Sequence, residues 1–218
     1  MTEDAPTITT SPSKGKRPFR LGWFLAPIFV VIAIDQLTKW WVRHDPSLHA
    51  LEIIPGWFRF TYTLNPGMAL GIEWLPTPVV GTLSTAATIG ILYYVGRNVS
   101  KAPKAFLIAM GFVTGGAIGN IIDRMFLGLV EGYGGFMEGH VVDFLHFSLR
   151  IQDFSVFPYI FNVADIAISV SVITMLIFRN RILPPEPESE ISDYESSVSE
   201  SSVSESSVSE SSVSESSA

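Results

Sequence analysis

Four aspartates stand out because each lies in or beside a strongly apolar stretch: Asp35, Asp123, Asp143 and Asp165. A carboxylate in such surroundings costs free energy, which makes it a functional hypothesis by default. Two carboxylates that share a partly desolvated site cannot both ionise easily, so one keeps a proton. The ionised group can then deprotonate a water while the protonated group polarises a peptide carbonyl. That chemistry is peptide hydrolysis, and it needs no metal, cofactor or covalent intermediate.

The rest of the sequence offers little to other chemistries. It contains no Cys, which excludes thiolate nucleophiles and Cys-ligated metals. It contains no His-Glu-x-x-His, Gly-x-Ser-x-Gly, P-loop or Gly-x-Gly-x-x-Gly motif, and nothing indicates nucleic-acid binding. His140 and His146 lie three residues either side of Asp143, but no third ligand is spaced to complete a metal site. We therefore expect neither a metal nor a cofactor.

Charge is distributed unevenly along the chain. The net charge is −7, but nine of the 21 acidic residues follow residue 185, whereas all 14 Lys and Arg precede residue 182. The acidic balance therefore belongs to the tail, and the rest of the chain is nearly neutral. Charged residues make up 16% of the chain and hydrophobic residues 47%, whereas a soluble domain carries about 25% charged residues. This composition is typical of a membrane protein.

Four apolar stretches are long enough to predict membrane-spanning helices. The first would form about 33 Å of helix, against a bilayer core of about 30 Å. It is too long for a secretory signal peptide, and no small-x-small cleavage site follows it. The predicted fold class is a membrane all-α protein with a small β element, whose four transmembrane helices cover residues 21–42, 77–95, 105–122 and 161–178.

Basic residues predict the orientation of these helices. Lys and Arg collect in residues 1–20, in the 96–104 loop and at the end of the fourth stretch, which predicts that both termini are cytoplasmic. The loops over 43–76 and 123–160 then face outward. Aromatic and β-branched residues over 53–63 surround a Pro-Gly turn and predict a short strand or hairpin of an extracytoplasmic sheet.

Three parts follow from this organisation. We expect residues 1–20 to form a disordered basic arm and residues 21–183 to form the four-helix membrane domain. We expect residues 184–218, in which Ser-Ser-Val-Ser-Glu repeats four times after Glu195, to form a disordered acidic tail. One Val per repeat cannot bury a core.

The ionisable groups collect at one predicted level, near the outer membrane surface. They are Asp35 and Lys39 on the first helix, Asp123 and Arg124 on the third, Asp165 on the fourth, and Asp143 in the outer loop. Structural roles are the simplest reading of the first two pairs, as an ion pair at i, i+4 and as a helix-end cap. The last two aspartates are the stronger catalytic candidates, although each could instead cap a helix or a turn.

Small residues crowd the third apolar stretch. Gly111, Gly115 and Gly119 recur at intervals of four, which permits close helix packing in lipid. Asn120 and Asp123 would then be held on a rigid helix.

Five segments, in order, resemble the motifs of the lipoprotein signal peptidases, the signal peptidase II family. They are Asp35-Gln36-Leu37-Thr38-Lys39, residues 65–71, residues 115–124, Val141-Val142-Asp143-Phe144, and Phe161-Asn162-Val163-Ala164-Asp165. The resemblance covers about residues 25–180 and leaves out both ends of the chain.

The resemblance implies an aspartyl endopeptidase of the bacterial cytoplasmic (inner) membrane, with its active site near the outer face. Such an enzyme removes the signal peptide of prolipoproteins before a diacylglyceryl-modified cysteine, works among membrane lipids and is inhibited by globomycin. By position, the resemblance makes Asp143 and Asp165 the catalytic pair. Substrate-holding or supporting positions are Asn65, Asn120, Asp123, Arg124 and Asn162, with Asp35 and Lys39 as structural support.

The chain departs from the family pattern in two places. Met68 and Leu70 replace the usual Ala and Phe of the second motif. The link from Asp123 to Asp143 spans 20 positions, where the family usually has about nine. We expect the additional residues, 129–139, to form a flexible Gly-rich loop over the outer surface, either as a lid or in contact with lipid headgroups.

Two other function classes compete with the peptidase. In a transporter or proton-conducting protein the acids would form a relay, but such proteins place charges near the midplane and show internal repeats. This chain has its acids near one predicted face and no visible repeat in the helical part. A structural membrane scaffold would need none of the aspartates.

Overall fold

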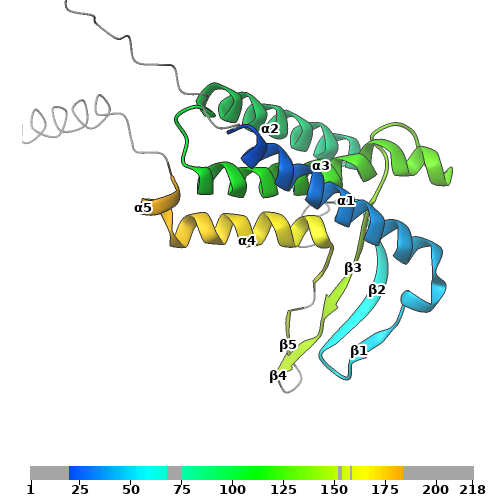
Figure 1. The fold of residues 1–218 in the computed structure, drawn as a ribbon. Helices are drawn as coiled ribbons and strands as arrows, with labels where there is room; N and C mark the ends of the chain where they lie inside the picture. The colour runs from blue at the N-terminus through cyan, green and yellow to red at the C-terminus, as the bar shows by residue number, and fades with distance from the viewer. Residues whose placement is uncertain (1–19, 68–74, 152–153, 158, 184–218) are drawn as a thin grey trace, which may run out of the picture. The chain divides into compact units, whose positions relative to one another are not determined.

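Helices dominate the computed structural model, which describes residues 20–67, 75–151, 154–157 and 159–183 (Figure 1). The predicted basic arm up to residue 19, the acidic tail, Met68 and Leu70 lie outside these ranges. The helices are α1 (Gly22–His44), η1 (Pro46–Leu48), α2 (Thr77–Asn98), α3 (Lys104–Glu131), α4 (Val163–Ile177) and α5 (Arg179–Ile182). Among the described residues, α1, α2 and α3 are long and apolar enough to cross a membrane, whereas α4 has 15 residues.

The third helix is the centre of the bundle, because α1, α2 and α4 all pack against it. Its glycines allow these approaches. A Cβ at Gly115 would lie 3.0 Å from Ile28 Cα of α1, and a Cβ at Gly116 would lie 2.5 Å from the Ala164 carbonyl oxygen of α4. The close helix packing predicted from the small residues is present.

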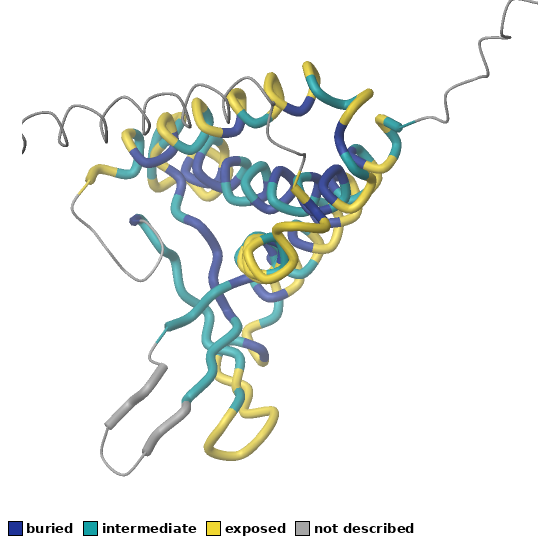
Figure 2. Tube along the Cα trace, turned by 90° about the vertical axis from the view of Figure 1, so that its left-hand side faces the viewer, coloured by how far each residue is buried: buried dark blue, intermediate teal, exposed yellow. Residues whose placement is uncertain are grey.

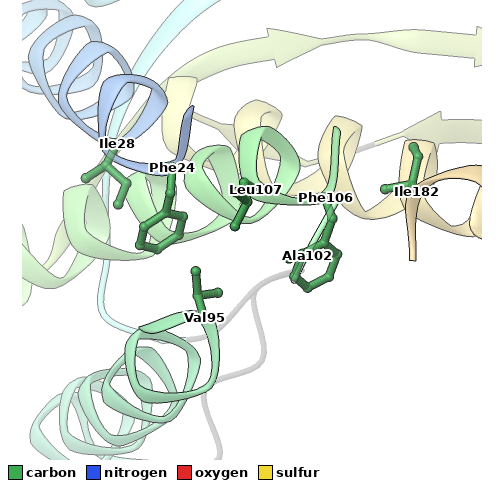
Figure 3. Close-up of a cluster of buried hydrophobic side chains, with 7 residues drawn as sticks. All are labelled: Phe24, Ile28, Val95, Ala102, Phe106, Leu107 and Ile182. Carbon is green, nitrogen blue, oxygen red and sulfur yellow. The ribbon is translucent and has the colours of Figure 1, made fainter. Parts of the chain in front are cut away.

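A cluster of buried apolar side chains closes the end of the bundle that lies away from the sheet (Figure 3). Phe24 of α1, Val95 of α2 and Leu107 of α3 meet there, together with Ile182 of α5. Burial continues through the interior of the bundle into residues 141–144 of the sheet, while the outward faces of the helices are exposed (Figure 2). This end of the bundle is packed with apolar side chains, and the buried polar side chains lie toward the end that joins the sheet.

A four-stranded antiparallel sheet extends from the other end of the bundle (Figure 1). Its order is β1 (Glu52–Ile54), β2 (Phe58–Asn65), β3 (Val141–Phe147) and β6 (Ile160–Phe161). A separate hairpin pairs β4 (Leu149–Ile151) with β5 (Phe154–Phe157). The predicted hairpin over 53–63 is present as β1 and β2. Strands β3 and β6 complete the sheet; β3 lies within the predicted outward loop, and β6 lies at the predicted boundary between that loop and the fourth helix.

The end of α3 differs from the sequence prediction. The helix continues nine residues beyond the predicted end at residue 122 and stops at Gly132, whose φ of 74° suits glycine. The chain then folds back along the helix, where the Gly139 N–H donates to the Arg124 carbonyl at 2.9 Å and the Met137 N–H donates to the Met125 carbonyl at 3.3 Å. A compact turn hydrogen-bonded to α3 stands where a flexible loop was expected.

The glycine contacts of α3 predict the effect of one methyl group. Gly116→Ala would press its Cβ against the Ala164 carbonyl oxygen. Overpacking of this kind costs about 1–3 kcal/mol. We expect a lower midpoint of thermal unfolding in detergent.

Gly90→Ala is the matched control, because a Cβ at Gly90 of α2 meets nothing within 4 Å. This variant should unfold at or slightly above the wild-type temperature, since alanine favours helix. Equal midpoints for the two variants would contradict the packing described for α3 and α4.

Candidate active site

The pairing of β2 with β3 brings the first predicted site residues together. Thr63 lies opposite Asp143 in the register, and Asn65 lies two residues further along the same face of β2. The Asn65 Nδ2 donates to Asp143 Oδ2 at 2.9 Å. The Asp143 side chain is buried with the residue only 2% exposed, so its carboxylate sits at the junction of sheet and bundle.

Asn162 begins α4 and fixes the position of Asp165. The Asp165 N–H donates to Asn162 Oδ1 at 3.1 Å, and the Asn162 N–H donates to Asp165 Oδ2 at 3.1 Å. This reciprocal capping box satisfies backbone donors that a helix start leaves unpaired. It also holds the Asp165 carboxyl at the N-terminal end of α4, where the helix dipole favours a negative charge.

Asn162 joins the two candidate carboxyls, through its side chain to Asp143 and through its backbone to Asp165. Its Nδ2 donates to Asp143 Oδ1 at 2.7 Å, while its backbone N–H already binds Asp165. Asn120 of α3 binds the other oxygen of Asp165, with Nδ2 to Oδ1 at 2.8 Å. The carboxyls of β3 and α4 therefore converge on one asparagine, although 22 positions separate them in the chain.

The surroundings of Asp143 change its protonation. Burial raises the pKa of the Asp143 carboxyl to about 7, and the nearby charge of Asp165 contributes in the same direction. The hydrogen bonds from Asn65 and Asn162 oppose the rise because they favour the ionised form. Asp143 is therefore divided between its protonated and ionised forms near neutral pH.

Lys39 is the hub of the polar groups behind the pair. Its Nζ lies 2.8 Å from Asp35 Oδ2, 2.9 Å from Asp123 Oδ2 and 2.9 Å from Asn120 Oδ1. An ammonium has three donors and no acceptor, so each donor has one partner here. The Lys39 residue is 1% exposed and Asp35 is fully buried, so the predicted i, i+4 pair lies inside the protein.

The two aspartates bound by Lys39 also hold the backbone of the site. Asp35 Oδ1 accepts the Ala164 N–H at 3.0 Å, and Asp123 Oδ2 accepts the Val142 N–H at 3.2 Å. Ala164 and Val142 each immediately precede a candidate catalytic aspartate. Gln36, for which the sequence predicts no role, joins this group, because its Nε2 donates to Asp123 Oδ1 at 3.1 Å. The sequence did contain a signal for this role, because Gln36 lies between Asp35 and Lys39 in the first motif segment.

Arg124 lies beside the pair and reaches the end of β2. Its Nη2 donates to the Gly67 carbonyl at 2.6 Å, and its Nη1 donates to the Asn120 carbonyl at 3.3 Å. The residue is buried, and its Nε has no hydrogen-bond partner within the described ranges. The predicted helix-end cap is thus a buried cation that links α3 to the Asn65-Pro66-Gly67 segment.

The two histidines that flank Asp143 in sequence do not join it in space. His146 Nδ1 lies 3.1 Å from Arg59 Nε, and His140 packs its ring against Tyr133. Burial and the Arg59 charge lower the pKa of His146. Within the described part of the chain, no group of three His, Asp or Glu residues is arranged to hold a metal ion.

Comparison with known proteins identifies a family. Residues 27–180 match the family model described as signal peptidase (SPase) II. A lipoprotein signal peptidase of Chlorobium luteolum is 38% identical over 168 residues, which cover 73% of this chain and 92% of that protein. A lipoprotein signal peptidase of Symbiobacterium thermophilum is 40% identical over 159 residues, which cover 71% of this chain and 90% of that protein.

Two solved structures are similar to this chain in fold. One bacterial membrane enzyme, solved by the in meso method at 2.3 Å, superposes with a TM-score of 0.57 at 26% identity and covers 72% of this chain and 86% of its own. A second, at 1.9 Å, superposes with a TM-score of 0.52 at 28% identity and covers 72% of this chain and 91% of its own. The helical bundle and small sheet are therefore the fold of membrane enzymes, and the chain belongs to the signal peptidase II family.

Proposed function

We propose that this chain is an intramembrane aspartyl endopeptidase that removes the signal peptide from prolipoproteins. Its family is a peptidase family, and the similar proteins described above are named lipoprotein signal peptidases. The proposed cut lies just before a diacylglyceryl-modified cysteine. The observation that carries the mechanism is that Asp143 and Asp165 both bind Asn162.

The mechanism assigns one task to each carboxyl. Asp143, whose pKa is raised to about 7, holds the proton that polarises the scissile carbonyl. Asp165 takes a proton from the attacking water, and the tetrahedral intermediate forms. Protons then return to the leaving amine as the peptide bond breaks.

The contacts of Asp123 argue against the alternative pair of Asp123 with Asp165. Asp123 forms an ion pair with the buried ammonium of Lys39, and the same oxygen accepts the Val142 N–H. These contacts give Asp123 a supporting role, because its charge is already paired and it holds the backbone next to Asp143. Asp143 receives hydrogen bonds only from amide side chains in the described structure.

Binding of the substrate backbone falls to the amides and to Arg124. The Arg124 Nε is buried and lacks a partner within the described ranges, so it is suited to receive a substrate carbonyl. Asn65 and Asn120 orient the carboxyls and line the same region. The acyl chains of the substrate would lie against the helices, and globomycin-type inhibitors would compete for this site.

The membrane topology belongs to the same proposal. We assign α4 as the fourth membrane segment, with both termini in the cytoplasm and the sheet on the opposite side of the cytoplasmic membrane. Arg97, Lys101 and Lys104 flank the α2–α3 connection, and Arg179 and Arg181 follow α4, which supports this orientation. Membership of a peptidase family disfavours the proton-relay transporter and the scaffold.

The catalytic assignment predicts a loss of cleavage without a loss of fold. Asp143→Asn and Asp165→Asn should each lower cleavage of a lipidated prolipoprotein in proteoliposomes by about 100-fold or more, because general acid–base catalysis contributes at least that much. Their thermal unfolding in detergent should remain cooperative. Cleavage is read as the size shift of the substrate on a gel.

Two further aspartates serve as controls. Asp45→Asn changes a carboxyl that binds only Ser47 in the described structure and should cleave at the wild-type rate. Asp123→Asn should lower the unfolding temperature, since it weakens the bond to Lys39. Full cleavage by Asp143→Asn or Asp165→Asn would remove the assignment of the pair.

The pKa of Asp143 predicts the alkaline limb of the pH profile. Activity needs the proton on Asp143, so kcat/KM should fall as pH rises through about 7. Asn65→Ala removes a hydrogen bond that lowers this pKa, so the limb should move to higher pH. A limb that stays in place, or moves to lower pH, in folded Asn65→Ala would contradict the role of Asp143 as proton holder.

A further inference from the structure

The part of α3 that extends beyond the active site has an exposed apolar surface, here called the end patch. Phe126, Leu129, Val130, Tyr133 and Phe136 form it, and they are 46%, 53%, 70%, 42% and 56% exposed. Phe126, Leu129 and Val130 recur at i, i+3 and i+4, so they share one side of α3, and Tyr133 and Phe136 follow in the turn after the helix. From residue 106 to residue 125, by contrast, α3 has no exposed residue.

The turn after α3 holds the end patch in one shape. Phe136 returns to contact Phe126, with ring centroids 6.1 Å apart in an edge-on arrangement. The Tyr133 hydroxyl accepts the His140 N–H at 2.9 Å, and Glu138 Oε2 accepts the Gly135 N–H at 2.7 Å. The patch is therefore pre-organised without a partner in the described structure.

An ion pair marks the level at which the helices end. Arg43 Nη2 near the end of α1 lies 3.2 Å from Glu131 Oε1 at the end of α3. Asp35 precedes Arg43 by eight positions, and Asp123 precedes Glu131 by eight positions. At 1.5 Å per residue, both helices place the aspartates of the Lys39 hub, Asp35 and Asp123, about 12 Å below the ion pair.

The length of α4 gives the distance from the active site to the opposite surface of the membrane. From Asp165 to Ile177 it advances about 18 Å. Together with the 12 Å above the hub, this distance is about 30 Å, the thickness of the hydrocarbon core. The shortness of α4 is then explained, because it begins at the buried site and crosses only the part of the core below it.

The side chains near the ion pair have the composition of a membrane–water boundary. Trp40 and Trp41 are 56% and 53% exposed just before Arg43. Tyr133 follows Glu131 in the turn just past the end of α3. Trp and Tyr collect where hydrocarbon meets headgroups, and the apolar part of the end patch lies on the hydrocarbon side of this level.

We propose that the end patch is a lipid-binding surface. Its occupants are the acyl chains and the headgroup boundary of the leaflet on the sheet side of the bundle. Val130 and Phe126 contact acyl chains, and Tyr133 lies at the boundary. By binding lipid, the extended end of α3 holds the carboxyl pair at a fixed depth beneath the headgroups. The proposal rests on the membrane enzyme proposed above.

Single-cysteine labelling tests the proposal directly, because the chain contains no cysteine. Val130→Cys and Phe136→Cys, each carrying a nitroxide, would be reconstituted into phosphatidylglycerol–phosphatidylethanolamine vesicles at low protein density. Collision with oxygen, which concentrates in lipid, is compared with collision with a water-soluble nickel chelate. Leu37→Cys on the exposed face of α1 is the lipid control, and Ala50→Cys, in the exposed segment after η1, is the aqueous control.

We expect both end-patch labels to favour oxygen several-fold over the nickel chelate, as Leu37→Cys does. Labels that collide with the nickel chelate as freely as Ala50→Cys would overturn the proposal. Protection from both agents would also overturn it, since a second copy of the chain would then cover the patch. The measurement does not depend on cleavage, so it separates failure of this proposal from failure of the proposed peptidase.

Discussion

The ammonium group of Lys39 is the interaction on which the site depends. It is buried and binds three acceptors, one of them on its own helix and two on α3. Two of those acceptors continue to backbone N–H groups, at Ala164 and Val142, and Asn120 continues to Asp165. One cation therefore fixes the start of α4 and the start of β3, which carry the two carboxyls. Removing one partner would leave uncompensated charge in a medium that solvates charge poorly.

The same arrangement gives the two carboxyls different tasks. Asp165 lies in a capping box at a helix N-terminus, where hydrogen bonds and the helix dipole favour negative charge. Asp143 lies in a strand at the junction of sheet and bundle, where burial raises its pKa to about 7. Two acids of one type thus differ through their environments. Asn162 keeps them together, since its side chain binds one and its backbone binds the other.

Much of this could be predicted from the sequence, and what could not has physical causes. The lengths of the apolar stretches predicted the helices, and the Pro-Gly turn predicted the β1–β2 hairpin. The four-residue spacing of the glycines predicted the close packing of α3. The long-range pairings of β3 with β2 and β6 leave no local pattern, so this region read as a loop. The helix end at Glu131 was missed because Asp123 and Arg124 end the apolar run at residue 122, whereas the helix continues to Gly132. Hydropathy alone could not show that Asp123 lies eight positions before the end of its helix.

The most direct measurement is the stability and activity of Lys39→Met. The account predicts a loss of about 3–5 kcal/mol in unfolding free energy together with a loss of cleavage. In the triple variant Lys39→Met, Asp35→Asn, Asp123→Asn, much of the stability should return while cleavage stays low, because no charge is left unpaired but the backbone anchors are weakened. Lys39→Met with wild-type unfolding and wild-type cleavage would contradict the claim that this buried cation positions the pair.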